Sequence, residues 1–324
     1  MAVFVNTNYS ALQGQRYLGN VQNQLTTTYQ RLSSGMRINS AKDDAAGLQI
    51  ADRLTSQING LNQGNRNASD GIALAQTMEA GMDEISGMLQ KMRTLTVQAS
   101  NGTNTQSDRD ALAKEMSSLA TEVNRIAMKT TFAGKTILNG KSKDTSSLFG
   151  QDNTNGSDKG AAGSDGTMTL QVGSNKGDTI SFNATSVMFS KLNAPGDAIM
   201  KEGDGIFQTN KDTGVVVVKL SKADFSTPGN ANYIGNVIDM FDKMLATVDG
   251  QRADLGAIQN RLESSIRNQS NVAANEADAR SRIRDADFAE ESANLSQQSI
   301  IQQAAASMLM QANTRPQLGL SLLG

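Results

Sequence analysis

The chain has no cysteine, histidine or tryptophan among its 324 residues, and only 3 prolines. Without cysteine there is no disulfide framework, no thiolate nucleophile and no zinc–thiolate cluster. Without histidine there is no imidazole general base, no Ser–His pair and no histidine metal ligand. A Ser-x-x-Lys pair occurs nowhere, and the carboxylate pairs Asp43–Asp44 and Glu290–Glu291 are typical of helix starts or a solvated face. The sequence therefore predicts no catalytic, cofactor or metal site and favours a protein that is not an enzyme.

Aromatic residues are also scarce, at 4% of the chain, and the hydrophobic fraction is 38%. This composition suits long helices packed through Leu, Ile, Met and Ala better than one large globular core. The net charge of −2 gives no field of one sign for a nucleic acid or an anionic membrane. No stretch approaches the roughly 18 apolar residues of a membrane span, and the start lacks the basic and apolar regions of a secretory signal peptide.

Charged residues are nearly absent from both ends of the chain. Between residues 1 and 30 the only charged side chain is Arg16, and between residues 292 and 324 it is Arg315. Both stretches carry apolar residues at helical spacing. Such a helix is marginal alone, because fixing the backbone costs about 1–2 kcal/mol per residue and burying a leucine returns only about 1.5–3 kcal/mol. We therefore expect the ends to be completed by assembly, through each other and through neighbouring copies.

The apolar stripes of the two ends are the candidate packing surface between subunits. An apolar stripe is ordinarily part of an intramolecular core, and we favour that interpretation for residues 43–130 and 233–270. At the ends, the lack of solubilising charges favours an intermolecular role. The candidate residues for subunit–subunit packing are Leu18, Val21, Leu25, Leu32, Leu295, Ile300, Ile301 and Met308.

Helical periodicity organises the first part of the chain. Residues 1–34 read as a helical arm that ends at Gly35, because glycine readily takes the left-handed conformation. A capping-box-like pair, Ser40 and Asp43, predicts the start of a second helix that continues to about Ala99. We expect close contacts or a bend at the glycines inside this helix, which are Gly60, Gly64, Gly71, Gly81 and Gly87.

Two further helices are expected downstream. Residues 101–104 form a break, and Ser107 with Asp110 predicts a capping box at the start of the next helix. Helical spacing resumes near Tyr233 and continues into the uncharged end. Long helices from the two ends of one chain are expected to lie side by side as a hairpin.

The middle of the chain, residues 140–230, is dominated by Gly, Asp, Asn, Ser and Thr. Within it Thr167–Val172 and Thr179–Phe182 read as strands around the hairpin loop Gly173–Gly177. Val215–Leu220 is a second β-like run. The fold class we predict is therefore mainly α with a β-rich insertion, a long helical-hairpin rod whose N- and C-terminal helices pair as a coiled coil.

One segment of the middle resembles part of a calcium-binding loop. Asn153-Thr154-Asn155-Gly156 has the spacing of the loop centre, but Gln151 and Ala162 stand where ligating carboxylates are required. We interpret it as a turn.

Long runs near both ends match a known family. Leu32–Ala51, which reads LSSGMRINSAKDDAAGLQIA, resembles the N-terminal signature of bacterial flagellin. SRIRDADFA and ASMLMQAN resemble the family's C-terminal pattern, and LQVG resembles its hairpin. The likeness covers roughly residues 1–140 and 230–324, and its length makes it far more specific than a short motif.

The resemblance implies a structural subunit that self-assembles into the flagellar filament, a helical homopolymer used for motility. In the family the two termini form an inner coiled-coil tube, the long helices form an outer tube, and the middle projects outward. Flagellins are secreted unfolded through the type III flagellar export apparatus, without a cleaved signal peptide. The implied partners are an export chaperone that holds the C-terminal helices, the flagellar cap and the hook-associated proteins. The implied location is the extracellular filament.

The family is also sensed by the host innate immune protein Toll-like receptor 5. Its receptor segment aligns with Leu89–Glu115, and three positions carry over: Lys91, Leu95 and Glu115. The family commonly has arginine at the first position, and lysine lacks the bidentate fork of arginine.

The resemblance and the composition together divide the chain into five segments. The ends form the two halves of the inner coiled-coil domain, the adjoining segments form the helical rod domain with its hairpin, and a short variable segment faces outward. In chain order the predicted boundaries are 1–42, 43–185, 186–230, 231–284 and 285–324.

Three other functions compete with the filament subunit. A hook–filament junction protein shares the terminal design but is made in few copies. A cytoplasmic signalling coiled coil accounts for the long helices but not for the uncharged ends. An enzyme is the weakest alternative.

Overall fold

The computed structural model describes residues 7–140, 147–149, 166–189, 191–192, 206–209, 215–225 and 233–321, and within these ranges the side chains of all residues except 209, 222 and 315–321. The chain forms two compact units. The terminal unit comprises residues 1–59 and 271–324, and the central unit comprises residues 60–270. The turn interpretation of Asn153–Gly156 and parts of the predicted segment 186–230 lie outside the described residues.

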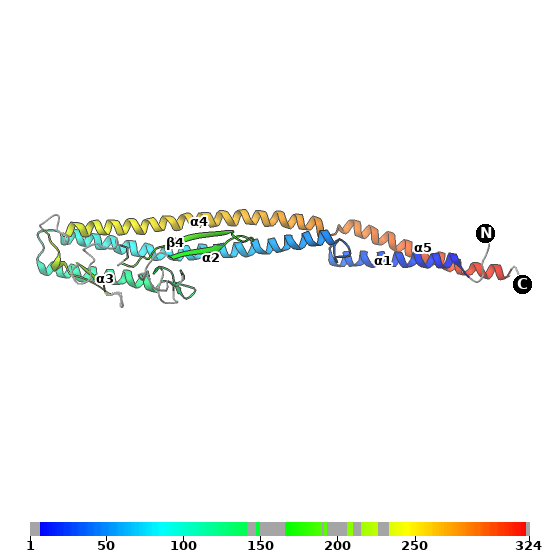
Figure 1. Ribbon diagram of the computed structural model, residues 1–324, viewed down its shortest axis with the longest axis horizontal. Helices are drawn as coiled ribbons and strands as arrows, with labels where there is room; N and C mark the ends of the chain where they lie inside the picture. The colour runs from blue at the N-terminus through cyan, green and yellow to red at the C-terminus, as the bar shows by residue number, and fades with distance from the viewer. Residues whose placement is uncertain are drawn as a thin grey trace, which may run out of the picture. The chain divides into compact units, whose positions relative to one another are not determined.

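The terminal unit contains the antiparallel helices α1 (Tyr9–Ser34) and α5 (Phe288–Ser321), which lie side by side in Figure 1. The Asn8 side-chain amide donates to the carbonyl of Ala312 at 2.8 Å, and Arg31 pairs with Glu291 at 3.1 Å. Residue numbers therefore rise along one helix as they fall along the other. The predicted pairing of N- and C-terminal helices is confirmed.

Helix α1 begins and ends for local reasons. The Asn8 side chain caps its first turn by accepting from the Ala11 backbone N–H at 3.1 Å. Gly35 follows the last turn with a φ of 70°, a left-handed conformation that suits glycine. The predicted helix end at Gly35 is confirmed.

Helix α2 (Ala45–Ala99) starts later than predicted. Asp43 does not cap it: its carboxylate accepts from the Asn39 and Ser40 backbone N–H groups, which closes a turn before the helix. The Asp44 carboxylate instead accepts from the Gly47 backbone N–H at 2.9 Å. The start predicted from Ser40 and Asp43 is wrong, because a second aspartate adjacent to the first provides the cap.

The central unit is built on α2, α3 (Gln106–Lys129) and α4 (Ile234–Arg284), of which α2 and α4 also contribute residues to the terminal unit. Arg93 pairs with Asp242 at 2.6 Å, and the Gln259 amide donates to Glu79 at 3.0 Å, so α2 and α4 are antiparallel here. Figure 1 shows this pair with α3 beside α2.

The start of α3 also differs from the prediction. The capping box is formed by Thr105 and Asp108, not by Ser107 and Asp110. The Asp108 carboxylate accepts from the Thr105 backbone N–H at 2.9 Å, and the Thr105 hydroxyl accepts from the Asp108 backbone N–H at 3.3 Å. Both pairs have the required spacing of three, and only the position of the preceding turn decides between them.

The β structure consists of small antiparallel pairs. Strands β3 (Gly166–Gln171) and β4 (Thr179–Ala184) form the predicted hairpin, with Leu170 opposite Ile180. Its apolar face packs on the helices, and its Thr, Ser, Asn and Gln face is exposed. The other elements are β1 (Thr131–Phe132), β2 (Lys135–Thr136), β5 (Phe207–Thr209), β6 (Val216–Val218) and the 3₁₀ turn η2 (Leu220–Lys222).

The core of the central unit combines the helical stripes with the insertion. Leu74, Met82 and Leu89 of α2 are almost fully buried. The rings of Phe189, Phe207 and Phe241 cluster, with centroids 5.3–6.4 Å apart, and join the insertion to α4. The mainly α fold with a small β-rich insertion is confirmed.

The two compact units divide the chain at residues 59 and 270, inside α2 and α4. The helix ends near the predicted boundaries 42 and 284 separate α1 from α2 and α4 from α5. The five-segment division itself stays a prediction.

Candidate functional site

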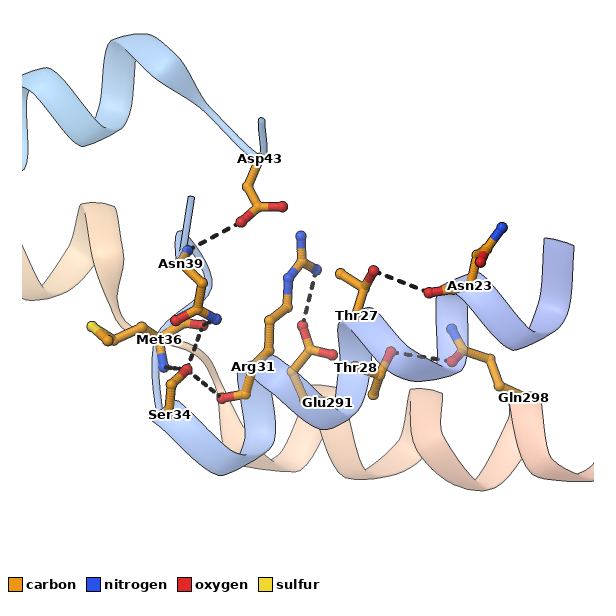
Figure 2. Close-up of polar contacts among 10 residues, drawn as sticks. All are labelled: Asn23, Thr27, Thr28, Arg31, Ser34, Met36, Asn39, Asp43, Glu291 and Gln298. Carbon is orange, nitrogen blue, oxygen red and sulfur yellow. Dashed lines mark hydrogen bonds and ion pairs between the residues drawn. The ribbon is translucent and has the colours of Figure 1, made fainter. Parts of the chain in front are cut away.

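Polar contacts hold α1 and α5 together along their seam. The Thr28 hydroxyl donates to the Gln298 side-chain oxygen at 3.1 Å, and Arg31 donates to the Glu291 carboxylate at 3.1 Å (Figure 2). The Glu291 side chain is only 9% exposed and that of Arg31 31% exposed. A charge this far from water requires its partner, so the pair sets the register of the two helices.

Apolar residues fill the same seam. Val21 is buried, and Leu18, Leu25, Leu32 and Leu295 are each half-buried. Five of the eight residues predicted to pack between subunits therefore already have partial burial within one chain.

The other three predicted packing residues remain exposed. The exposed fractions are 67% for Ile300, 42% for Ile301 and 71% for Met308, and nearby Met310 is 66% exposed. Most exposed large apolar side chains among the described residues belong to the terminal unit: Tyr9, Leu12, Tyr17, Tyr29, Ile50, Val272, Phe288, Ile300, Ile301, Met308 and Met310.

Helical geometry places these exposed residues on several sides of α5. Glu291 lies nine residues from Ile300, which is half a turn out of phase at 3.6 residues per turn. Because Glu291 contacts α1, Ile300 points away from α1. Met308 and Met310 project toward opposite flanks by the same count. An exposed apolar surface that faces several directions, in a stretch of helix without charges, is typical of an interaction surface.

Backbone hydrogen bonds join the segment that follows α1 to the segment that precedes α5. The Arg37 backbone N–H donates to the Arg284 carbonyl at 2.6 Å, and the Ala286 backbone N–H donates to the Gly35 carbonyl at 3.0 Å. Met36 and Asp285 pair as an antiparallel bridge. The α1–α2 connection and the α4–α5 connection are thus hydrogen-bonded to each other at the base of the α1–α5 pair.

Asp43 stabilises the turn on one side of this connection. Hydrogen bonds from the Ser40 and Asn39 backbone N–H groups, and from the Ser40 hydroxyl, hold the pKa of Asp43 below its ordinary value. The Asn39 amide donates to the Met36 carbonyl at 3.0 Å (Figure 2). All of these hydrogen bonds join residues three or four positions apart, so the turn is determined by its local sequence.

Two shallow hollows lie on the terminal unit. One, of about 430 Å³, has Tyr17 and Met308 among its walls. The other, of about 640 Å³, includes Tyr29, Ser33 and Asn39. Their walls are uncharged, which suits another uncharged helix better than a charged small molecule.

The three residues predicted to contact a host receptor lie in the central unit. Lys91 on α2 and Glu115 on α3 form an ion pair at 2.7 Å, with side chains 58% and 44% exposed. Leu95, one turn further along α2, is 8% exposed and packs in the core. The fold brings the two charged residues together at the surface, whereas Leu95 presents little area to solvent.

Sequence reasoning missed the polar partners of the seam. Thr28, Arg31, Glu291 and Gln298 are ordinary residues with no motif around them. Arg31 and Glu291 are the charged residues that border the uncharged ends, and this position is the one signal that pointed to them.

Neither a metal-binding cluster nor a membrane-spanning helix occurs among the residues that the structure describes. Those residues hold no cluster of three or more carboxylate, imidazole or thiol groups arranged to bind a metal ion. No helix in the same ranges is both long and apolar enough to cross a bilayer.

Comparison with protein families gives two matches. The model of the bacterial flagellin N-terminal helical region matches residues 5–143, and that of the flagellin C-terminal helical region matches residues 238–323. Both ends that carry the paired helices are therefore covered.

Relatives match over the whole chain. Flagellin A of Vibrio cholerae is 37% identical over 401 aligned residues, and flagellin D of Vibrio anguillarum is 38% identical over 380, each covering 100% of both proteins. The alignments are longer than this chain, so the relatives contain residues that it lacks.

One solved structure shares the fold of this chain. A putative flagellar hook-associated protein from Vibrio parahaemolyticus aligns with a TM-score of 0.54 at 17% identity, covering 75% of this chain and 100% of that one. At this identity the likeness shows the fold alone. Bacillus cereus flagellin aligns over 65% of this chain and 94% of its own, with 25% identity and a TM-score of 0.42.

The matches at both ends and the full-length relatives favour a filament protein over a hook–filament junction protein. Paired terminal helices with few charges and with apolar residues turned outward are what a self-assembling subunit requires. The chain belongs to the bacterial flagellin family and is a structural subunit of the flagellar filament.

Proposed function

We propose that subunits join through the outward surface of α5, around Ile300, Ile301 and Met308, while the seam residues hold α5 against α1. The observation that carries this proposal is the 67% exposure of Ile300 on the side away from α1, in a stretch with no charged side chain. Burying each such side chain against a neighbour contributes about 1.5–3 kcal/mol. Several neighbours are needed because the exposed residues face several directions.

The seam residues contribute indirectly. Leu18, Leu25, Leu32 and Leu295 keep part of their surface exposed along the edges of the helix pair. In the filament this remaining surface is covered by adjacent copies, so the same residues support both the pair and the polymer.

Substitution on the outer surface tests the proposal. In Ile300→Gln and Met308→Gln the monomer keeps its helical content, but the critical concentration for polymerisation rises by about tenfold or more. Ile300→Leu and Met308→Leu, which keep an apolar side chain at the same positions, are the controls and leave polymerisation unchanged. Normal polymerisation of both glutamine variants, measured by sedimentation and electron microscopy, contradicts the proposal.

The filament is extracellular, and the chain reaches it unfolded through the type III flagellar export apparatus. An export chaperone covers the apolar surface of α5 before export, and the cap and hook-associated proteins contact the ends of the polymer. The exposed apolar residues support this, because free chains that present them would otherwise aggregate. Deleting residues 303–324 should leave a soluble monomer that neither polymerises nor binds the chaperone, and filaments from this variant would refute the model.

Within the filament we assign residues 1–42 and 285–324 to the inner coiled-coil tube. Residues 43–185 and 231–284 form the outer tube, and residues 186–230 face outward. Residues that change accessibility on assembly, mapped by chemical footprinting of monomer and filament, test this division.

The Lys91–Glu115 pair on the central unit is the proposed contact for host Toll-like receptor 5, with Leu95 supporting the surface from below. Both charged side chains are accessible, but they are engaged with each other at 2.7 Å. Lys91→Ala and Glu115→Ala should each reduce receptor activation in a reporter cell, without changing the melting temperature. Equal activation by both variants would remove these residues from the proposed contact.

A further inference from the structure

The sequence contains four Asn–Gly pairs, at Asn59–Gly60, Asn101–Gly102, Asn139–Gly140 and Asn155–Gly156. Such pairs are chemically reactive because the glycine nitrogen meets no side chain when it approaches the amide carbon of asparagine. The reaction also requires a free backbone N–H and a backbone that can bend. The fold provides these conditions unequally among the pairs within the described residues; the fourth pair lies outside them.

Asn101–Gly102 lies in the exposed turn between α2 and α3. Among the described residues no hydrogen bond from the Gly102 backbone N–H is found. The Asn101 side-chain oxygen accepts one long hydrogen bond, from the Thr103 backbone N–H at 3.5 Å, which is beyond the usual 2.7–3.2 Å and holds the amide only weakly. No heavy atom lies within 4 Å of the position of a Cβ on Gly102. The attacking nitrogen and the side-chain carbon that it attacks are therefore held only by long, local hydrogen bonds, the other being from the Asn104 backbone N–H to the Asn101 carbonyl at 3.2 Å.

The two other described pairs are restrained in different ways. Asn59 is exposed, but Gly60 lies inside α2, where each backbone N–H donates to the carbonyl four residues earlier. Gly140 is buried, and its carbonyl accepts from the Ser147 hydroxyl at 2.6 Å. Asn59 thus matches Asn101 in exposure and differs from it in backbone freedom.

We propose that Asn101 is a site of spontaneous deamidation. The deprotonated Gly102 nitrogen attacks the side-chain amide carbon of Asn101, the bond from that carbon to the side-chain nitrogen breaks, and ammonia leaves. Water then adds to either carbonyl of the resulting succinimide ring and opens it. The products are aspartate and isoaspartate at position 101. One water is consumed and one ammonia released, and no oxidant, reductant or cofactor takes part.

The modification changes the turn in two ways. A new negative charge appears just after the C-terminus of α2, where the helix dipole disfavours it. Isoaspartate also inserts an extra carbon into the backbone between two local hydrogen bonds, from Asn101 N–H to the Gln98 carbonyl at 3.1 Å and from Asn104 N–H to the Asn101 carbonyl at 3.2 Å. Because the reaction is irreversible, the modified fraction increases with the age of the chain.

Mass spectrometry of the full-length protein tests the proposal. The folded chain is incubated in mildly alkaline heavy-oxygen water and digested with trypsin, which places the three pairs on the separate peptides 94–109, 54–66 and 136–141. We expect the rate of heavy-oxygen incorporation to be at least about tenfold higher at Asn101 than at Asn59, because Asn59 reacts only when its helical turn opens. Equal rates at the two positions would overturn the proposal. The pair Asn155–Gly156 is on its own peptide, 144–159, and does not interfere.

Two further measurements separate the effect of the fold from that of the sequence. In urea-unfolded chains Asn59 and Asn101 should react at similar rates; an Asn59 that stays slow would show that the helix is not the cause. Gly102→Ala should slow the reaction at Asn101 several-fold without changing the melting temperature, because the added Cβ meets no neighbour and the φ of Gly102 is not in the left-handed region. An unchanged rate in this variant would also refute the proposal.

Discussion

Gly64 of α2 lies directly against the carbonyl oxygen of Val172, just past the end of strand β3, and a Cβ at Gly64 would overlap that oxygen. One turn earlier a Cβ on Gly60 would crowd Ser174, and two turns later one on Gly71 would crowd Leu170. The Asn67 side chain reinforces the contact by donating to the Gln171 carbonyl at 2.9 Å. The hairpin therefore packs its backbone onto a glycine-bearing face of the helix.

The first prediction follows from this contact. Gly64→Ala should lift the hairpin from α2 and destabilise the central unit by about 1–3 kcal/mol, because the clash is with a backbone atom that has no free rotation. Gly87→Ala on the same helix is the control, since no heavy atom lies within 4 Å of its Cβ position. It should stabilise the protein by about 0.5–1 kcal/mol through helix propensity. Urea unfolding of both variants measures the difference, and equal shifts would contradict the contact.

A second prediction separates the seam of the terminal helices from their outer surface. Val21→Ala should speed hydrogen exchange throughout α1 and α5 of the monomer, because Val21 is only 9% exposed between them. Ile300→Ala should leave monomer exchange unchanged and weaken polymerisation alone. Exchange rates altered equally by both substitutions would show that the two surfaces are not distinct.

The third prediction concerns the Arg31–Glu291 pair. Glu291→Gln keeps the size of the side chain but removes its charge, which should cost about 1–3 kcal/mol of pairing between α1 and α5. Glu290→Gln, at the exposed neighbouring position, should have no measurable effect. Thermal unfolding of both monomeric variants, followed by circular dichroism, measures the difference. Identical melting curves would exclude a structural role for the Arg31–Glu291 pair.

The fourth prediction concerns acid. A hydrogen-bonded pairing with Arg93 lowers the pKa of Asp242 below its ordinary value of 3.8 in the folded chain. Because the folded pKa is the lower one, the stabilisation is fully present above about 3.8 and is lost as the pH falls through the folded value. Asp242→Asn should therefore lose less stability than the unaltered chain over this acidic range. Urea midpoints at a series of pH values give the two slopes, and parallel slopes would rule out this contribution.

Asp43 and Asp108 should also make the folded chain less stable in acid. Local hydrogen bonds lower the pKa of both carboxyl groups, from Ser40 and Asn39 in one case and from Thr105 in the other. Each stabilises a turn next to a helix start, so acid should loosen both turns. This local effect should persist in Asp242→Asn.

The periodicity of apolar residues and the distribution of charge were sufficient to predict the helices, the hairpin and the pairing of the two ends. Gly35 ended the first helix as predicted, because the left-handed conformation at a helix end depends on one residue. The helix starts were less accurate: the patterns at Ser40–Asp43 and Ser107–Asp110 satisfy the capping rule, yet Asp44 and Thr105 provide the caps. A cap is chosen by where the preceding loop brings the chain, and spacing alone does not contain that information.

The scarcity of charge at both ends was by itself enough to indicate self-assembly, since a helix with an apolar stripe and no charges must cover that stripe to be stable. Only the tertiary structure decided which apolar residues α1 and α5 cover for each other and which, such as Ile300, remain outside. It also decided that Arg31 meets Glu291, 260 residues away. A helical pattern defines the faces of one helix, but the partner of a face depends on how distant segments pack, and that is determined by the whole chain.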